Sequence, residues 1–121
     1  MPMRTLLAAF AAFALPAALL AATGPESGRE KPFETQMQPG DIHEECVRLE
    51  QGKSRAFEWT SDGPVDFNIH FHSGERVSYP VRLKAQTKAA GRFTAKTGED
   101  YCWMWTARRP TRVTGRIGAE E

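Results

Sequence analysis

The sequence predicts an all-β protein, a small antiparallel β-sandwich, behind an N-terminal signal peptide. Apolar and polar residues alternate over most of the chain after residue 43, and turn residues divide this pattern into about seven short runs. The one candidate helical stripe is short and covers residues 83–90. Since a lone sheet would leave a row of aromatic residues in water, we expect the strands to form a sandwich or a closed barrel.

Residues 1–22 have the layout of a secretory signal peptide. Arg4 precedes an apolar run from Leu6 to Ala22, and small residues end that run. The run contains Pro16 and is shorter than the roughly 20 residues that span a membrane, so an uncleaved anchor is the weaker alternative. We therefore expect a periplasmic or secreted protein with no membrane attachment in its mature form.

The segment that follows, residues 23–42, is predicted to be a flexible arm. Prolines and glycines are frequent in it, and Phe33 and Met37 are its sizeable apolar residues before position 40. The whole chain has 16 basic and 15 acidic residues, and removal of Arg4 with the signal peptide leaves no net charge. A neutral domain lacks the basic surface of a nucleic-acid-binding protein.

The sandwich domain is expected over residues 43–118, and its strands can be described in order. Val47 and Leu49 share one face of the first strand. Phe57 and Trp59 face inward from a second strand, which is expected to stop at the turn cluster of residues 61–64. The clearest strand covers residues 65–72, where apolar and polar residues alternate without error.

The remaining strands follow the turn at residues 73–74. The returning strand covers residues 77–82, and Pro80 places it at a sheet edge. Phe93 and Ala95 belong to the next strand, an aromatic-rich strand covers residues 101–105, and residues 113–117 complete the domain.

Cys46 and Cys102 are the two cysteines of the chain. An even pair in an exported protein is most simply a disulfide, and a redox-active CxxC pattern is absent from the sequence. Both cysteines fall on the outward side of their strands if the alternating aromatic residues form the core.

Residues 46–117 resemble the Golgi-dynamics (GOLD) domain, a β-sandwich of eukaryotic secretory-cargo receptors. The segments VDFNIHFH, SGERVSYP and GRFTAKTGEDYCWMW carry the resemblance. It implies the sandwich fold and a disulfide between the first strand and the aromatic strand. Cys102 stands two residues before the family's cysteine position, which Met104 occupies, and Ala107 replaces the family's asparagine, so we do not carry over cargo transport.

His70 and His72 lie two residues apart on one strand, so both rings project from the same face and could share a metal ion. Met104 faces outward from the aromatic strand and could supply a thioether if the two strands are neighbours. His43 is a fourth candidate. Imidazole and thioether ligands favour copper, with zinc as the alternative.

Several functional alternatives remain open at the level of the sequence. The two histidines could simply occupy a solvent-facing strand surface. His70, His72 and Glu75 are similar to the first metal motif of cupin barrels, but the spacings from Gly63 to His70 and from His72 to Glu75 each differ by one residue. No nucleophile elbow, phosphate loop or HExxH motif is present in the sequence.

The sequence therefore predicts an exported, non-enzymatic binding module that binds copper through His70, His72 and Met104. A metal-free protein-interaction domain is the first alternative, and a cupin-like metalloenzyme is the second. The identity of a protein partner is not encoded in any motif.

Overall fold

The computed structural model describes residues 28–121, which form six antiparallel strands and no helix, so the predicted all-β class is confirmed. The strands are β1 (Lys31–Met37), β2 (Ile42–Leu49), β3 (Ser54–Ser73), β4 (Arg76–Thr94), β5 (Glu99–Ala107) and β6 (Thr111–Glu120). In this part of the chain, no helix is long and apolar enough to cross a membrane. The predicted signal peptide, residues 1–22, lies outside the described residues.

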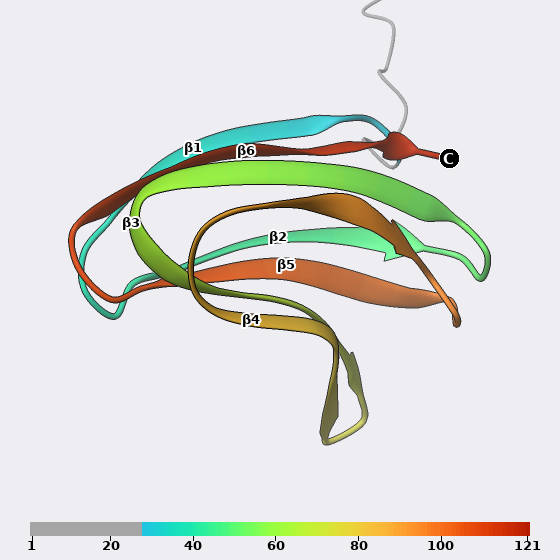
Figure 1. Ribbon diagram of the computed structural model, residues 1–121. Helices are drawn as coiled ribbons and strands as arrows, with labels where there is room; N and C mark the ends of the chain where they lie inside the picture. The colour runs from blue at the N-terminus through green and yellow to red at the C-terminus, as the bar shows by residue number, and fades with distance from the viewer. Residues whose placement is uncertain (1–27) are drawn as a thin grey trace, which may run out of the picture.

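One continuous sheet folds over to make the two layers of a β-sandwich (Figure 1). The first layer contains β1, β6, the first half of β3 and the second half of β4. The second layer contains β2, β5, the second half of β3 and the first half of β4. The hairpin of β3 and β4 therefore belongs to both layers.

β3 changes layers at residues 61–64, where the sequence predicted the end of a strand. Pairing of β3 with β6 runs to Ser61, and pairing with β5 begins at Val65. The Ser61 hydroxyl donates a hydrogen bond to the Gly63 carbonyl oxygen (2.6 Å) at this corner. The expected strand end is thus wrong: the turn-forming residues bend β3 by interrupting its register, and the strand continues beyond them.

β4 makes the matching bend at Ala85, whose φ of 52° is in the left-handed region. The Ala85 N–H donates to the Asp66 carboxylate (3.0 Å), which holds the bend against β3. Residues 83–90, which carry the short helical stripe, are therefore strand. Pro80 lies on this edge strand, as the sequence predicted.

Part of the expected flexible arm is an ordered strand. β1 pairs with β6 from Lys31, opposite Ile117, to Met37, opposite Thr111. Met37 is buried and Phe33 packs against the core, so the two apolar residues of this segment mark its inner face. The sandwich therefore begins at residue 31, about a dozen residues before the predicted boundary at 43.

The core between the layers is rich in aromatic side chains, and all three tryptophans belong to it, as predicted. Trp105 lies at its centre: its ring centroid is 4.5 Å from that of Phe33, 5.3 Å from that of Phe67 and 6.4 Å from that of Trp59. These contacts connect β5 to strands of both layers. The outward positions of β2, β3 and β5 are left to form the surface described next.

Candidate functional site

The outer face of the second layer contains a row formed by Cys46, Cys102 and His70. Cys46 on β2 lies opposite Cys102 on β5, and Cys102 lies opposite His70 on β3. The two cysteines form the predicted disulfide. We call the surface around this row the His70 face.

The neighbouring row on the His70 face consists of Glu44, Met104 and Asn68, on the same three strands. Met104 is therefore level with Asn68, four residues along β3 from His72. At about 3.3 Å per residue, this is about 13 Å of strand. Met104 shares the predicted face, but the register separates it from His72.

His70 is buried, with 4% of its surface exposed, although it lies on the outer face. Its Nδ1 is 2.7 Å from Oδ1 of Asn68, and its Nε2 is 3.0 Å from Oε1 of Glu44. The ring also contacts those of His72 and Tyr79, with centroid distances of 5.2 and 5.7 Å. These neighbours cover the ring that the sequence placed on an open surface.

Burial lowers the pKa of His70 below that of an ordinary histidine. The nearby Glu44 carboxylate raises this pKa, and the neighbouring His72 lowers it, but burial is the largest effect. The ring is therefore neutral at neutral pH, with one N–H to donate and one nitrogen lone pair.

Three potential ligand atoms come together on this face. One oxygen of Glu44, one ring nitrogen of His70 and Sγ of Cys102 all lie within 4.8 Å of one another. In the residues that the structure describes, this is the one group of three such histidine, cysteine or acidic residues. His72 contacts the His70 ring but lies outside this group, and its exposed side chain would have to rotate to join it.

His43, the fourth predicted ligand, lies on the opposite face of its layer. Its ring stacks on Phe33 at 5.2 Å and lies 5.8 Å from the Trp105 ring, and its Nε2 is 3.1 Å from a Glu45 oxygen. His43 therefore does not join His70. The sequence of β2 already indicates this orientation, because His43 and the inward-facing Val47 are an even number of residues apart and so lie on the same face of the strand.

Glu44 and Asn68 are the site residues that the sequence did not indicate. Each has the outward parity of its strand, which the alternation does show. Their approach to His70 depends on β5 lying between β2 and β3, and no local pattern reveals that order.

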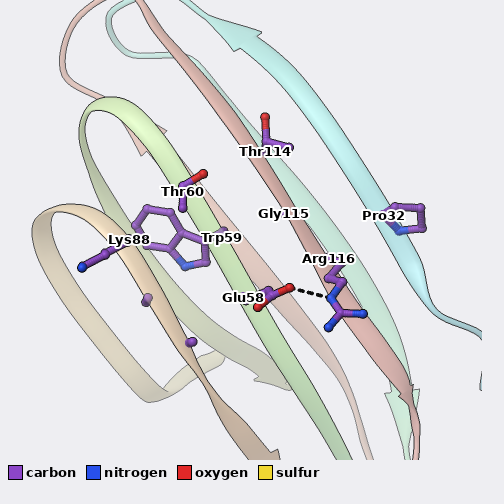
Figure 2. A pocket seen from close by; sticks show the side chains of 10 residues that line it. Pro32, Glu58, Trp59, Thr60, Lys88, Thr114, Gly115 and Arg116 are labelled. Carbon is purple, nitrogen blue, oxygen red and sulfur yellow. Dashed lines mark hydrogen bonds and ion pairs between the residues drawn. The ribbon is translucent and has the colours of Figure 1, made fainter.

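A second concave surface lies on the outer face of the first layer (Figure 2). This groove of about 740 Å³ is lined by residues from all four strand segments of that layer, including Pro32, Lys88 and Gly115. On one side, Arg116 donates to Glu58 (2.7 Å) and to Glu30 (2.9 Å). Because the Arg116 guanidinium is already paired with both carboxylates, the groove has less distinctive chemistry than the His70 face.

No protein-family model matches this sequence, and no curated protein is significantly similar to it in sequence. Solved structures are similar in fold. PliG of Aeromonas hydrophila, a periplasmic inhibitor of g-type lysozyme, superposes with a TM-score of 0.55 at 10% identity over 77% of this chain and 90% of its own.

Two further structures have the same small all-β fold. The pre-peptidase C-terminal domain of a Bacillus anthracis collagenase gives a TM-score of 0.56 at 13% identity, over 78% of this chain and 90% of its own. The Yersinia pseudotuberculosis-derived mitogen gives 0.52 at 9% identity, over 76% and 86%. At these identities, the chain is similar to these proteins in fold alone. The β-sandwich implied by the GOLD resemblance is supported, without assignment to that family.

Proposed function

We propose that this protein is an exported, non-enzymatic binding module that holds a transition-metal ion on its His70 face. His70 and Glu44 supply two ligands, and His72 supplies a third after rotation of its exposed side chain. The ion is copper in the oxidised protein, because imidazole nitrogen and carboxylate oxygen are ligands that Cu(II) accepts.

The observation that carries this proposal is the 3.0 Å separation of His70 Nε2 and Glu44 Oε1. When the neutral ring donates its Nδ1–H to Asn68, the Nε2 lone pair faces a carboxylate oxygen. In that tautomer two acceptors face each other at this distance, and a metal ion between them would satisfy both. Two ligand atoms bound to one ion at about 2.0–2.2 Å lie about 2.8–3.1 Å apart when the bond angle is about 90°, as in tetragonal Cu(II) sites, so the pair already has this spacing.

Asn68 has the role of the outer partner of a metal-binding histidine. Metal-bound imidazoles almost always donate their other N–H to a carbonyl or carboxylate oxygen, which fixes the ring orientation. The Asn68 Oδ1 atom, 2.7 Å from Nδ1, provides such an acceptor. This contact directs Nε2 toward Glu44.

Export is supported by the disulfide, because structural disulfides persist in oxidising compartments. The fold of PliG, a periplasmic inhibitor protein, is consistent with the same location.

The test is calorimetric titration of the oxidised protein with Cu(II) and Zn(II), with electron paramagnetic resonance to detect nitrogen ligands to Cu(II). We expect one ion per chain with micromolar or tighter affinity. Replacing both histidines (His70→Ala with His72→Ala) should weaken binding by at least about tenfold, or about 1.4 kcal/mol. Glu44→Gln should also weaken it.

His43→Gln is the matched control, because it removes the third histidine from the other face of the same layer. Met104→Leu tests the thioether ligand, and we expect little change. If binding is weak and unchanged in the double histidine variant, the metal-binding proposal is overturned. Stronger binding of Zn(II) than of Cu(II) would replace copper with zinc as the ion.

A second candidate function is metal-free protein binding along the edge strand β4. Val77, Tyr79 and Leu83 are large apolar side chains with 37–41% of their surface exposed on this strand. Arg82 lies over the Tyr79 ring at 3.9 Å. Capture of one periplasmic protein that persists with a chelator, and is lost in Tyr79→Ala, would favour this function over metal binding.

A further inference from the structure

We infer that the Cys46–Cys102 disulfide covers a second, reduction-dependent metal site, in which both cysteines, His70 and Glu44 bind one Zn²⁺ ion. The inference rests on the proposed function in one respect: both sites use His70 and Glu44 as ligands. The second site exists only in the reduced protein, whereas the first exists in the oxidised protein. It binds zinc in place of copper, because its two added ligands are thiolates.

The geometry places all four side chains on one surface. Cys102 Sγ is within 4.8 Å of the His70 and Glu44 ligand atoms, and Cys46 Sγ is bonded to it. Ligand atoms on a tetrahedral Zn²⁺ are about 3.3–3.8 Å apart, given bonds of about 2.0–2.3 Å. His70, Glu44 and Cys102 are therefore already near this spacing, and after the sulfur–sulfur bond opens the Cys46 side chain must rotate to complete the site.

The backbone that holds these ligands does not depend on the disulfide alone. Cys46 lies in the eight-residue pairing of β2 with β5, and His70 ends the pairing of β3 with β5. Opening the sulfur–sulfur bond leaves these main-chain hydrogen bonds in place. The three strands therefore keep the side chains in one row after reduction.

The two cysteine residues differ in exposure, which favours attack at Cys46. Cys46 is exposed, whereas Cys102 has 8% of its surface exposed. A small thiolate attacks Sγ of Cys46, the sulfur–sulfur bond breaks, and Cys102 leaves as a thiolate. A second thiol then attacks the mixed disulfide and releases Cys46.

The overall reduction conserves electrons and protons. Two small thiols are oxidised to one disulfide, and their two electrons and two protons pass to the two cysteines. Binding of Zn²⁺ to both thiolates then releases two protons.

The donor set selects the ion. Two thiolates, one imidazole and one carboxylate match the tetrahedral S and N ligands of zinc, whereas magnesium and calcium prefer sites made of oxygen atoms. Asn68 again supports His70 from the outer side, at 2.7 Å from Nδ1.

The experiment compares the oxidised protein with protein reduced by a phosphine that is then removed. Co²⁺ is the spectroscopic probe, since thiolate ligation gives a near-ultraviolet charge-transfer band. We expect this band in the reduced protein alone, at one ion per chain, and its loss on addition of Zn²⁺. His70→Gln should lower the Zn²⁺ affinity of the reduced protein by at least about tenfold, and His43→Gln should not.

Cys46→Ser provides a form that cannot close the bridge and keeps Cys102 beside His70. We expect it to give a weaker charge-transfer band without any reductant. Circular dichroism of each form reports whether the sheet is retained.

The two proposals fail in different ways. Folded, reduced protein that binds Co²⁺ without a charge-transfer band overturns the reduction-dependent site and leaves the proposed function intact. Loss of the sheet on reduction, without recovery when Zn²⁺ is added, also overturns it. Oxidised protein that binds no metal overturns the proposed function, while a thiolate band in the reduced protein would still support the second site.

Discussion

Ala85 shows how a single residue can carry backbone strain. In the described residues it is the one non-glycine residue with positive φ, at 52°. The left-handed conformation costs a residue with a Cβ about 1–2 kcal/mol, and replacement by glycine removes this cost. Part of the gain is lost again, because the unfolded chain has more conformational freedom with glycine at this position. We expect Ala85→Gly to raise the free energy of unfolding by about 0.5–1 kcal/mol in urea denaturation.

Ala90→Gly is the control for this prediction, since Ala90 lies on the same strand at an ordinary φ. There the glycine should destabilise the protein by about 0.5–1 kcal/mol. Destabilisation by both substitutions would show that Ala85 is not strained.

Asp66, also at the residue scale, should make stability depend on pH. Burial raises the pKa of its carboxyl group, but hydrogen bonds from Arg108 and from the Ala85 N–H, with the nearby positive charges, lower it below the ordinary value. A lowered folded-state pKa stabilises the protein above the unfolded pKa of about 3.9, and this contribution is lost as pH falls through the folded value.

We therefore expect Asp66→Asn to cost about 1 kcal/mol at neutral pH, a modest value because the side chain is partly exposed. The difference from the natural protein should shrink below pH of about 4. Urea denaturation at several pH values measures it, and a cost that does not change with pH would contradict the assigned role.

At the scale of elements, Gly115 controls how closely β6 approaches β3. A Cβ at this position would lie 2.6 Å from the Glu58 carbonyl oxygen and 2.6 Å from the Trp59 Cβ. Neither neighbour can move without shifting β3, so we expect Gly115→Ala to destabilise the sandwich by about 1–3 kcal/mol. Thr114→Ala, at the exposed neighbouring position, should cost about 0.5 kcal/mol or less.

At the scale of the whole molecule, the disulfide closes a loop over a sequence separation of 56. In the chain-entropy model, closing such a loop stabilises the folded protein by about 4 kcal/mol. This is a large part of the free energy of unfolding of a domain of this size. Replacing both cysteines by serine should lower the free energy of unfolding by about this amount. An unchanged midpoint in urea would contradict the expectation.

The same measurement connects stability to the zinc inference. Zn²⁺ at 100 times its Kd should return about 2.7 kcal/mol to the reduced natural protein. The double serine variant should gain nothing from the ion, because both thiolates are missing.

Local alternation of apolar and polar residues predicts a large part of the fold. It identifies the β3 residues 65–72, the inward tryptophans and the outward cysteines, because a strand alternates its side chains between two faces. It misses the corner at residues 61–64, since turn-forming residues look alike whether a strand ends or bends there. It also misses β1, which depends on pairing with β6 at the far end of the chain.

The sequence by itself determined the strand class, the faces of the clearest strands and the pairing of its two cysteines, because these follow from local periodicity and from count. The tertiary structure alone decided that β5 lies between β2 and β3, which brings Glu44 and Asn68 to His70 and sets Met104 apart from His72. Strand order and register are fixed by main-chain hydrogen bonds between distant segments and by packing of the shared core, so no short stretch of sequence contains them.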